Sequence, residues 1–161
     1  MIPMGQQFKN LPEIVCQSCT QTSTTNSEKT VVGSKVNIDN KPAAGTAYRI
    51  TLAGTNSGGN AAHTAKLLIG STAVMTLTAD AVTAVDWMAT FVVVFKDAKA
   101  QRVMGNMQGN ALDCENDYAA GSVDCTAGAE MKVQINSGHE SDTVTCEVCV
   151  VEKWQQELTT E

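Results

Sequence analysis

Residues 87–95, Trp-Met-Ala-Thr-Phe-Val-Val-Val-Phe, decide the fold of this chain. Their β-branched and aromatic residues, with no glycine or proline, favour a strand over a helix. Successive side chains of a strand point to opposite faces, so the odd-numbered residues share one face and the even-numbered residues share the other. A strand with one wet face alternates apolar and polar residues, whereas this strand is apolar on both faces. We therefore expect both faces to be covered, the second one by another copy of the chain.

The even-numbered face of this strand is the predicted oligomer interface. Its residues are Met88, Thr90, Val92 and Val94.

Composition and charge exclude several classes of function. The formal charge is −6, and the 11 basic residues are scattered along the chain. Nucleic-acid binding needs clustered Lys and Arg, so we expect no nucleic-acid partner. No stretch approaches the roughly 18 apolar residues of a spanning helix, and residues 1–7 lack the features of a signal peptide. We expect a protein that is assembled in a cytoplasm and has no membrane partner.

Residues 1–30 are predicted to form an N-terminal arm outside the sheets. They hold two of the three prolines and a polar tract at residues 20–30, which is too poor in apolar residues to order itself alone. The exceptions are Phe8, Leu11, Ile14 and Val15, which we expect to dock the arm on a neighbouring molecule. A frayed terminus is the alternative.

The rest of the chain has the rhythm of strands and turns. Period-2 patterns predict strands at residues 32–38, 45–54, 64–69, 72–78, 85–96, 102–108, 131–136 and 143–150. Residues 97–99 are expected to form a short connection, so that residues 102–108 pair back onto the long strand. Residues 109–121 are expected to be irregular, and no helical periodicity is long enough for a crossover helix. These patterns predict an all-β, antiparallel jelly-roll sandwich of about eight strands over residues 31–153, followed by a C-terminal tail at residues 154–161.

Four elements of this pattern, in their order, resemble a known family. They are residues 45–54, residues 64–74, Trp87 with its long following strand, and residues 142–152. The chain resembles the jelly-roll domains of tailed-bacteriophage virion proteins, which occur as head decoration (cement) proteins and as knobs of tail fibres. The resemblance covers roughly residues 31–152 and implies a homotrimer. Relatives often carry charges after the tryptophan, where this chain has apolar residues, so the contact is expected to be drier here.

The expected function is that of a non-enzymatic cement protein on the outer surface of the head. Its partners would be itself, as a trimer, and the major capsid protein of the same virion. An arm that begins at Met1 and an acidic surface suit this function better than a tail-fibre or spike knob that binds a host receptor or glycan, which is the alternative. Three linked arms would bind by burial and avidity.

The six cysteines leave several chemistries open. They are Cys16, Cys19, Cys114, Cys125, Cys146 and Cys149. The two Cys-x-x-Cys pairs resemble halves of a zinc site, but residues three apart on a strand leave opposite faces, which argues against shared metal binding unless a bulge or the strand end intervenes. We expect at most one or two disulfides, with Cys146 as a small core residue, and a link from the arm to Cys149 stays possible.

No other motif predicts catalysis, a metal or a cofactor. His63 and His139 are expected at the surface, and the acidic residues Asp113, Glu115, Asp117 and Asp124 are expected to form a solvated loop. A carbohydrate-active enzyme would need paired carboxylates in a groove, and Asp86 and Glu130 are too isolated in the sequence to be nominated. Trp87 is expected in the core, with a subunit contact as the alternative, and Trp154 is expected at the end of the sandwich or on a partner.

Overall fold

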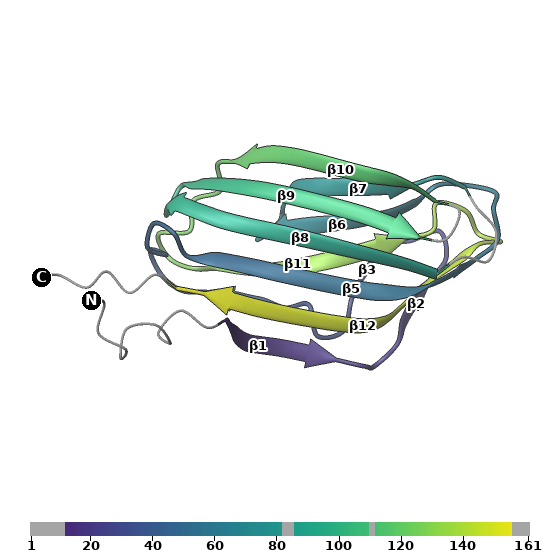
Figure 1. Ribbon diagram of the computed structural model, residues 1–161, viewed down its shortest axis with the longest axis horizontal. Helices are drawn as coiled ribbons and strands as arrows, with labels where there is room; N and C mark the ends of the chain where they lie inside the picture. Colours follow the sequence, from purple (N-terminus) through teal and green to yellow (C-terminus); the bar gives the residue numbers. More distant parts are fainter. Residues whose placement is uncertain (1–11, 82–85, 110–111, 156–161) are drawn as a thin grey trace, which may run out of the picture.

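The computed structural model describes residues 12–81, 86–109 and 112–155, although the side chains of residues 112–114 are not described. These residues form two antiparallel sheets that pack face to face, which confirms the predicted all-β sandwich (Figure 1). They include no helix, and therefore none long and apolar enough to cross a membrane.

The first sheet has seven strands in the order β1-β12-β5-β8-β9-β10, with β2 also paired to β12. Their bounds are β1 Glu13–Ser18, β2 Thr22–Thr24, β5 Ala47–Ser57, β8 Asp86–Asp97, β9 Ala100–Gly109, β10 Leu112–Gly121 and β12 Thr143–Trp154. The predicted long strand is β8, and it lies between β5 and β9.

The second sheet has five strands in the order β3-β11-β6-β7, with β4 also paired to β11. Their bounds are β3 Lys29–Thr30, β4 Val36–Ile38, β6 His63–Ile69, β7 Thr72–Ala79 and β11 Ala129–Asn136. After β5 the chain crosses to the second sheet and forms the β6-β7 hairpin there. It then returns to the first sheet, where β8 pairs with β5. Strands β11 and β12 each return to an earlier strand, β6 in the second sheet and β5 in the first.

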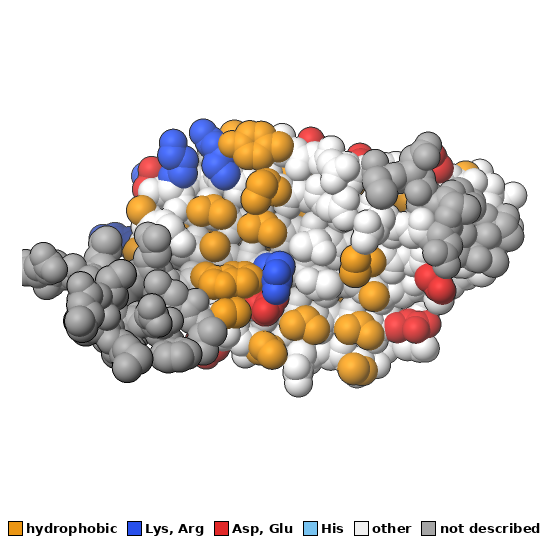
Figure 2. Space-filling model, viewed as in Figure 1, with side chains coloured by type: hydrophobic (Ala, Val, Ile, Leu, Met, Phe, Trp, Pro, Cys, Tyr) orange, Lys and Arg blue, Asp and Glu red, His pale blue; other side chains and the backbone are white. Residues whose placement is uncertain are grey.

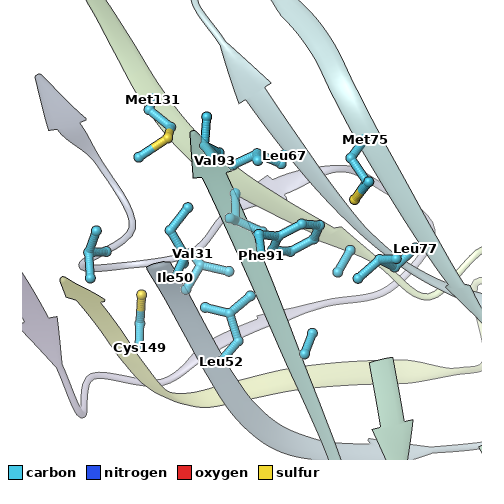
Figure 3. Close-up of a cluster of buried hydrophobic side chains, with 14 of the residues drawn as sticks. Val31, Ile50, Leu52, Leu67, Met75, Leu77, Phe91, Val93, Met131 and Cys149 are labelled. Atoms are coloured by element: carbon cyan, nitrogen blue, oxygen red, sulfur yellow. The ribbon is translucent and has the colours of Figure 1, made fainter. Parts of the chain in front are cut away.

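The core lies between the sheets and takes one face from each strand. Strand β8 contributes its odd-numbered residues from Trp87 to Phe95, all of them buried. Figure 3 shows Phe91 and Val93 pointing toward Leu67 and Met131 of the opposite sheet. Close packing leaves no room for a side chain at Gly105 of β9, where a Cβ atom would meet Met75 and Leu77 of β7. The even-numbered residues of β8 face outward.

The prediction that residues 1–30 stay outside the sheets is wrong for the described part of that segment. Strands β1 and β2 pair with β12, and β3 pairs with β11, all within the same chain. Backbone hydrogen bonds are available to any sequence at a sheet edge, so polar residues can join without an apolar face. Residues 1–11 of the predicted arm lie outside the described residues.

Residues 109–121 also differ from the prediction of an irregular segment. From Leu112 onward they form β10, which pairs with β9 at the edge of the first sheet. The sequence Glu-Asn-Asp-Tyr at residues 115–118 gives no apolar alternation from which a strand could be predicted, because most of these side chains are exposed. Together with β1, β2 and β3, this strand takes the described sandwich beyond the predicted eight strands.

A candidate assembly surface on the seven-stranded sheet

The outward side of the seven-stranded sheet carries cross-strand rows of side chains, and four of these rows contain the predicted interface residues of β8. We call these four rows the outer face; the next row, Thr145, Thr55 and Asp86, adjoins them. In strand order the rows are Trp154, Ala47, Val94, Arg102 and Ala120; then Glu152, Arg49, Val92, Met104 and Tyr118; then Val150, Thr51, Thr90, Asn106 and Asn116; then Val148, Ala53, Met88 and Gln108. Each row contains one of the predicted interface residues of β8.

Apolar side chains dominate three of these rows and stay exposed to solvent in the single chain. The exposed large side chains among them are Tyr118 at 62%, Met104 at 49%, Val148 at 40% and Met88 at 37%. Figure 2 shows hydrophobic side chains on this face in bands that run across the strands, with mostly polar side chains between them. Large apolar side chains that share one patch on a soluble protein mark interaction surfaces.

An ion pair lies within the apolar rows. Nε of Arg49 donates a hydrogen bond to Oε2 of Glu152, at 2.6 Å, from neighbouring strands. The Arg49 guanidinium also lies over the Trp154 ring, 5.1 Å from its centroid. The Arg49 side chain is 45% exposed, whereas that of Glu152 is 16% exposed. The two charges are therefore paired before any partner arrives.

A shallow depression of about 430 Å³ lies on the same face, over β8, β9 and β10. Val92, Met104 and Tyr118 supply its apolar lining. Asn106 and Asn116 line its polar side and are joined by a 2.8 Å hydrogen bond between their side chains. The depression can take an apolar side chain or a small polar ligand.

The predicted interface residues thus lie in the middle of the outer face, and most of their neighbours could not be identified from the sequence. Tyr118 was missed because its strand was not predicted. Arg49 and Glu152 were missed because 103 residues separate them in the sequence. The pairing of residues 102–108 with the long strand is confirmed, and it could have placed Met104 beside Val92.

The predicted docking residues of the arm lie in different environments. Ile14 is 57% exposed and lies opposite Glu152 in the pairing of β1 with β12, so it extends the apolar surface past the edge of the outer face. Val15 sits at an irregularity in β1 and packs against the core. Phe8 and Leu11 lie outside the described residues.

Cys146 and Cys149 point to the same side of β12 because a bulge lies between them. The register of β12 against β5 shifts between Cys146 and Val148, so Cys146 and Cys149 both face the core and are each 1% exposed. Burial raises the pKa of the Cys146 thiol to about 11 and that of the Cys149 thiol to about 12. The prediction of Cys146 as a core residue is confirmed. Cys16, Cys19, Cys125, Cys146 and Cys149 are free thiols.

His63 is buried at 2% exposure, so the prediction of a surface histidine is wrong for this residue. The Asn56 side chain lies 2.6 Å from its Nε2 atom. Burial lowers the pKa of His63, an effect that the nearby Asp142 carboxylate only partly offsets.

Asp142 fastens the loop that connects β5 and β6. Its carboxylate accepts hydrogen bonds from the backbone N–H groups of Asn60 and Ala61, at 2.8 and 3.0 Å, and from the Asn60 side chain, at 2.5 Å. Burial alone would raise the pKa of Asp142, but these hydrogen bonds outweigh it and lower the pKa. Gly58, at a φ of 86°, lies so close that any Cβ there would collide with the carboxylate.

Two further acidic candidates, Asp124 and Glu130, serve local structure, whereas the side chains of Asp113 and Cys114 lie outside the described part of the chain. Asp124 accepts hydrogen bonds from Thr126 and pairs with Lys99, which lowers the pKa of Asp124 to about 2. Glu130 pairs with Lys35 and Lys132. In the part of the chain that the structure describes, no three His, Cys, Asp or Glu side chains converge as metal ligands.

No protein-family model matches this chain, and no curated protein matches it significantly.

Proposed function

We propose that this chain is a non-enzymatic structural protein of a tailed-bacteriophage virion, a cement protein that trimerises on the outer surface of the head. The observation that carries the proposal is the outer face, where Tyr118, Met104 and Met88 stay exposed in a single chain. A second copy that covers this face removes their apolar surface from water, at roughly 25 cal/mol per Å².

The fold supports the proposal at the level of a variant jelly roll. The long returns of β12 to β5 and of β11 to β6, one in each sheet, support the proposal because jelly rolls also contain long connections back to an earlier strand. The meander β8-β9-β10 stays within one sheet and is the departure from that pattern.

The proposed partner of the trimer is the major capsid protein of the same virion. Residues 1–11 contain Phe8 and Leu11 and lead into the edge strand β1. Three such segments on one trimer would bind neighbouring coat subunits far more tightly than one, because the second and third contacts form at high effective concentration.

A deletion separates this contact from the fold. Because β1, β2 and β3 belong to the sheets, removal of residues 1–30 would damage the sandwich, whereas removal of residues 1–11 leaves every described strand in place. We expect the full chain to sediment with expanded capsids and the shortened chain to stay soluble and trimeric but unbound. Immunogold labelling on heads supports the proposal; labelling confined to tails overturns it.

The second candidate function is a tail-fibre or spike knob that binds a host glycan. The depression favours it, because the exposed Tyr118 ring can stack on a sugar and the amides of Asn106 and Asn116 can bond its hydroxyls. This function predicts glycan binding that Tyr118→Ala abolishes and that deletion of residues 1–11 leaves unchanged.

A further inference from the structure

The outer face is large enough to form a stable contact with a second copy of the chain. A strand spacing of about 4.8 Å and a rise of about 3.3 Å per residue give five strands and four rows a footprint of roughly 630 Å². In a trimer a different surface of the second copy would cover this footprint with an equal area, so the contact would bury roughly 1,260 Å² in total, which reaches the range of specific protein interfaces, about 1,200–2,000 Å².

The charges of the face also suit a second copy. The four rows contain the guanidinium groups of Arg49 and Arg102 and the carboxylate of Glu152, a formal charge of +1. The whole chain carries −6. A net positive face is complementary to the acidic remainder of a second copy, and Asp86 in the adjoining row marks where this positive region ends.

The ion pair on this face would be taken out of water by such a contact. Val92 flanks Arg49 on β8, Trp154 lies under the guanidinium, and Ile14 flanks Glu152 on β1. Exposed ion pairs contribute little, but a charge that is buried without its partner is strongly unfavourable. The pair makes burial possible because each charge already has its counter-ion within its own chain.

We propose that Arg49, held by Glu152 and Trp154, determines how a second copy docks on the outer face. Arg49 donates to Glu152 through Nε, and its two Nη groups make no hydrogen bond to any described residue. Once the face is covered, these donors need an acceptor, so the second copy must present a carbonyl or carboxylate oxygen there. Docking modes that place apolar groups over Arg49 are excluded, which gives the contact its specificity. This inference rests on the proposed self-association.

The test measures self-association of the full chain by sedimentation equilibrium for four variants. Glu152→Gln leaves Arg49 without its counter-ion and is expected to weaken association roughly 30-fold or more. Arg49→Met is expected to do the same, since Glu152 is then the unpaired charge. The double variant Arg49→Met/Glu152→Leu removes both charges and is expected to restore association while losing its defined stoichiometry.

The matched control is Asp39→Asn, which breaks the Lys153–Asp39 pair, also 2.6 Å long, outside the outer face. It is expected to leave association unchanged. Circular dichroism of each variant confirms that it is folded. If Glu152→Gln does not fold, Arg49→Met alone carries the test of the ion pair. A wild-type chain that stays monomeric overturns the proposed function. A wild-type oligomer that neither single variant weakens overturns the role of Arg49 alone.

Discussion

The two faces of β8 are almost equally apolar in sequence, yet the structure treats them differently. The odd-numbered face is completely enclosed, with Phe91, Val93 and Phe95 at 0% exposure. The even-numbered face keeps Met88 at 37% exposure and the next three outward residues half-buried. The fold of one chain therefore accounts for one apolar face and leaves the other without cover.

This difference separates stability from assembly. Residues of the inner face touch side chains of the opposite sheet, so their substitution changes the free energy of unfolding of a single chain. Residues of the outer face touch only neighbours on their own sheet, so their substitution changes association between copies. The same chemical change, made at adjacent positions of one strand, should therefore have two different outcomes.

The largest effect is expected for Phe91→Ala, which removes a buried ring between the sheets. The loss of apolar burial and the cavity left behind should lower the free energy of unfolding by about 3–5 kcal/mol. Val92→Ala, one residue away on the outer face, serves as the control and should change it by less than about 1 kcal/mol. Urea unfolding followed by tryptophan fluorescence measures both. Equal losses would mean that the outer face is also part of the core of one chain.

The next effect concerns association and is expected for Met104→Asp. Met104 lies between Val92 and Tyr118 on the outer face, and a carboxylate there would be buried without a partner. The dissociation constant between copies should rise roughly 30-fold or more, equivalent to about 2 kcal/mol. Sedimentation equilibrium measures this change, and urea unfolding of the monomer should be nearly unaffected. Unchanged association would place the contact elsewhere.

The sequence predicted the parts of this molecule whose side chains alternate within one strand. The long strand, its pairing with residues 102–108 and the two-sheet sandwich follow from period-2 patterns and from the apolar character of residues 87–95. Strands β1, β3 and β10 escaped prediction because they join by backbone hydrogen bonds at sheet edges, where exposed polar side chains such as Asn116 and Asp117 carry no pattern.

The candidate site was predictable only along β8. Its four residues belong to one strand, so their common face follows from spacing alone. Their neighbours come from strands far away in sequence, and register decides which residues meet. The burial of both Cys146 and Cys149 depends on a single bulge that no residue type in the segment announces.

A moderate effect is expected for Gly105→Ala on the inner side of β9. The new methyl group would collide with Met75 and Leu77 of the opposite sheet, which must shift to make room. Overpacking of this kind should lower the free energy of unfolding by about 1–3 kcal/mol. Asn106→Ala on the outward side of the same strand is the control for chemical denaturation. If Gly105→Ala were neutral, the sheets would pack less closely between β9 and β7 than the structure shows.

A smaller effect is expected from pH, through His63. Burial lowers its pKa in the folded chain, so the unfolded chain takes up a proton first, near pH 6.5. Stability should therefore be complete above about pH 7 and fall as the pH drops below 6.5. The lowered pKa of Asp142 acts in the same direction only below about pH 4, so the two windows are separate. Urea midpoints between pH 8 and 5 measure the slope, which His63→Gln should flatten; an unchanged slope would assign it to other groups.

The last prediction concerns the alkylation of the thiols, which should differ strongly between exposed and buried cysteines. Cys19 is exposed, whereas Cys146 and Cys149 are enclosed on the inner face with pKa values raised to about 11 and about 12. Because the thiolate is the reactive form, iodoacetamide at pH 8 should alkylate Cys19 in the native chain and leave the other two unmodified until urea is added. Peptide mass mapping distinguishes these sites. Rapid native labelling of Cys146 but not of Cys149 would contradict the structure. It would mean that β12 runs through Glu147 without a bulge, so that Cys146 points outward and the residues of β12 before Glu147 exchange their inward and outward positions.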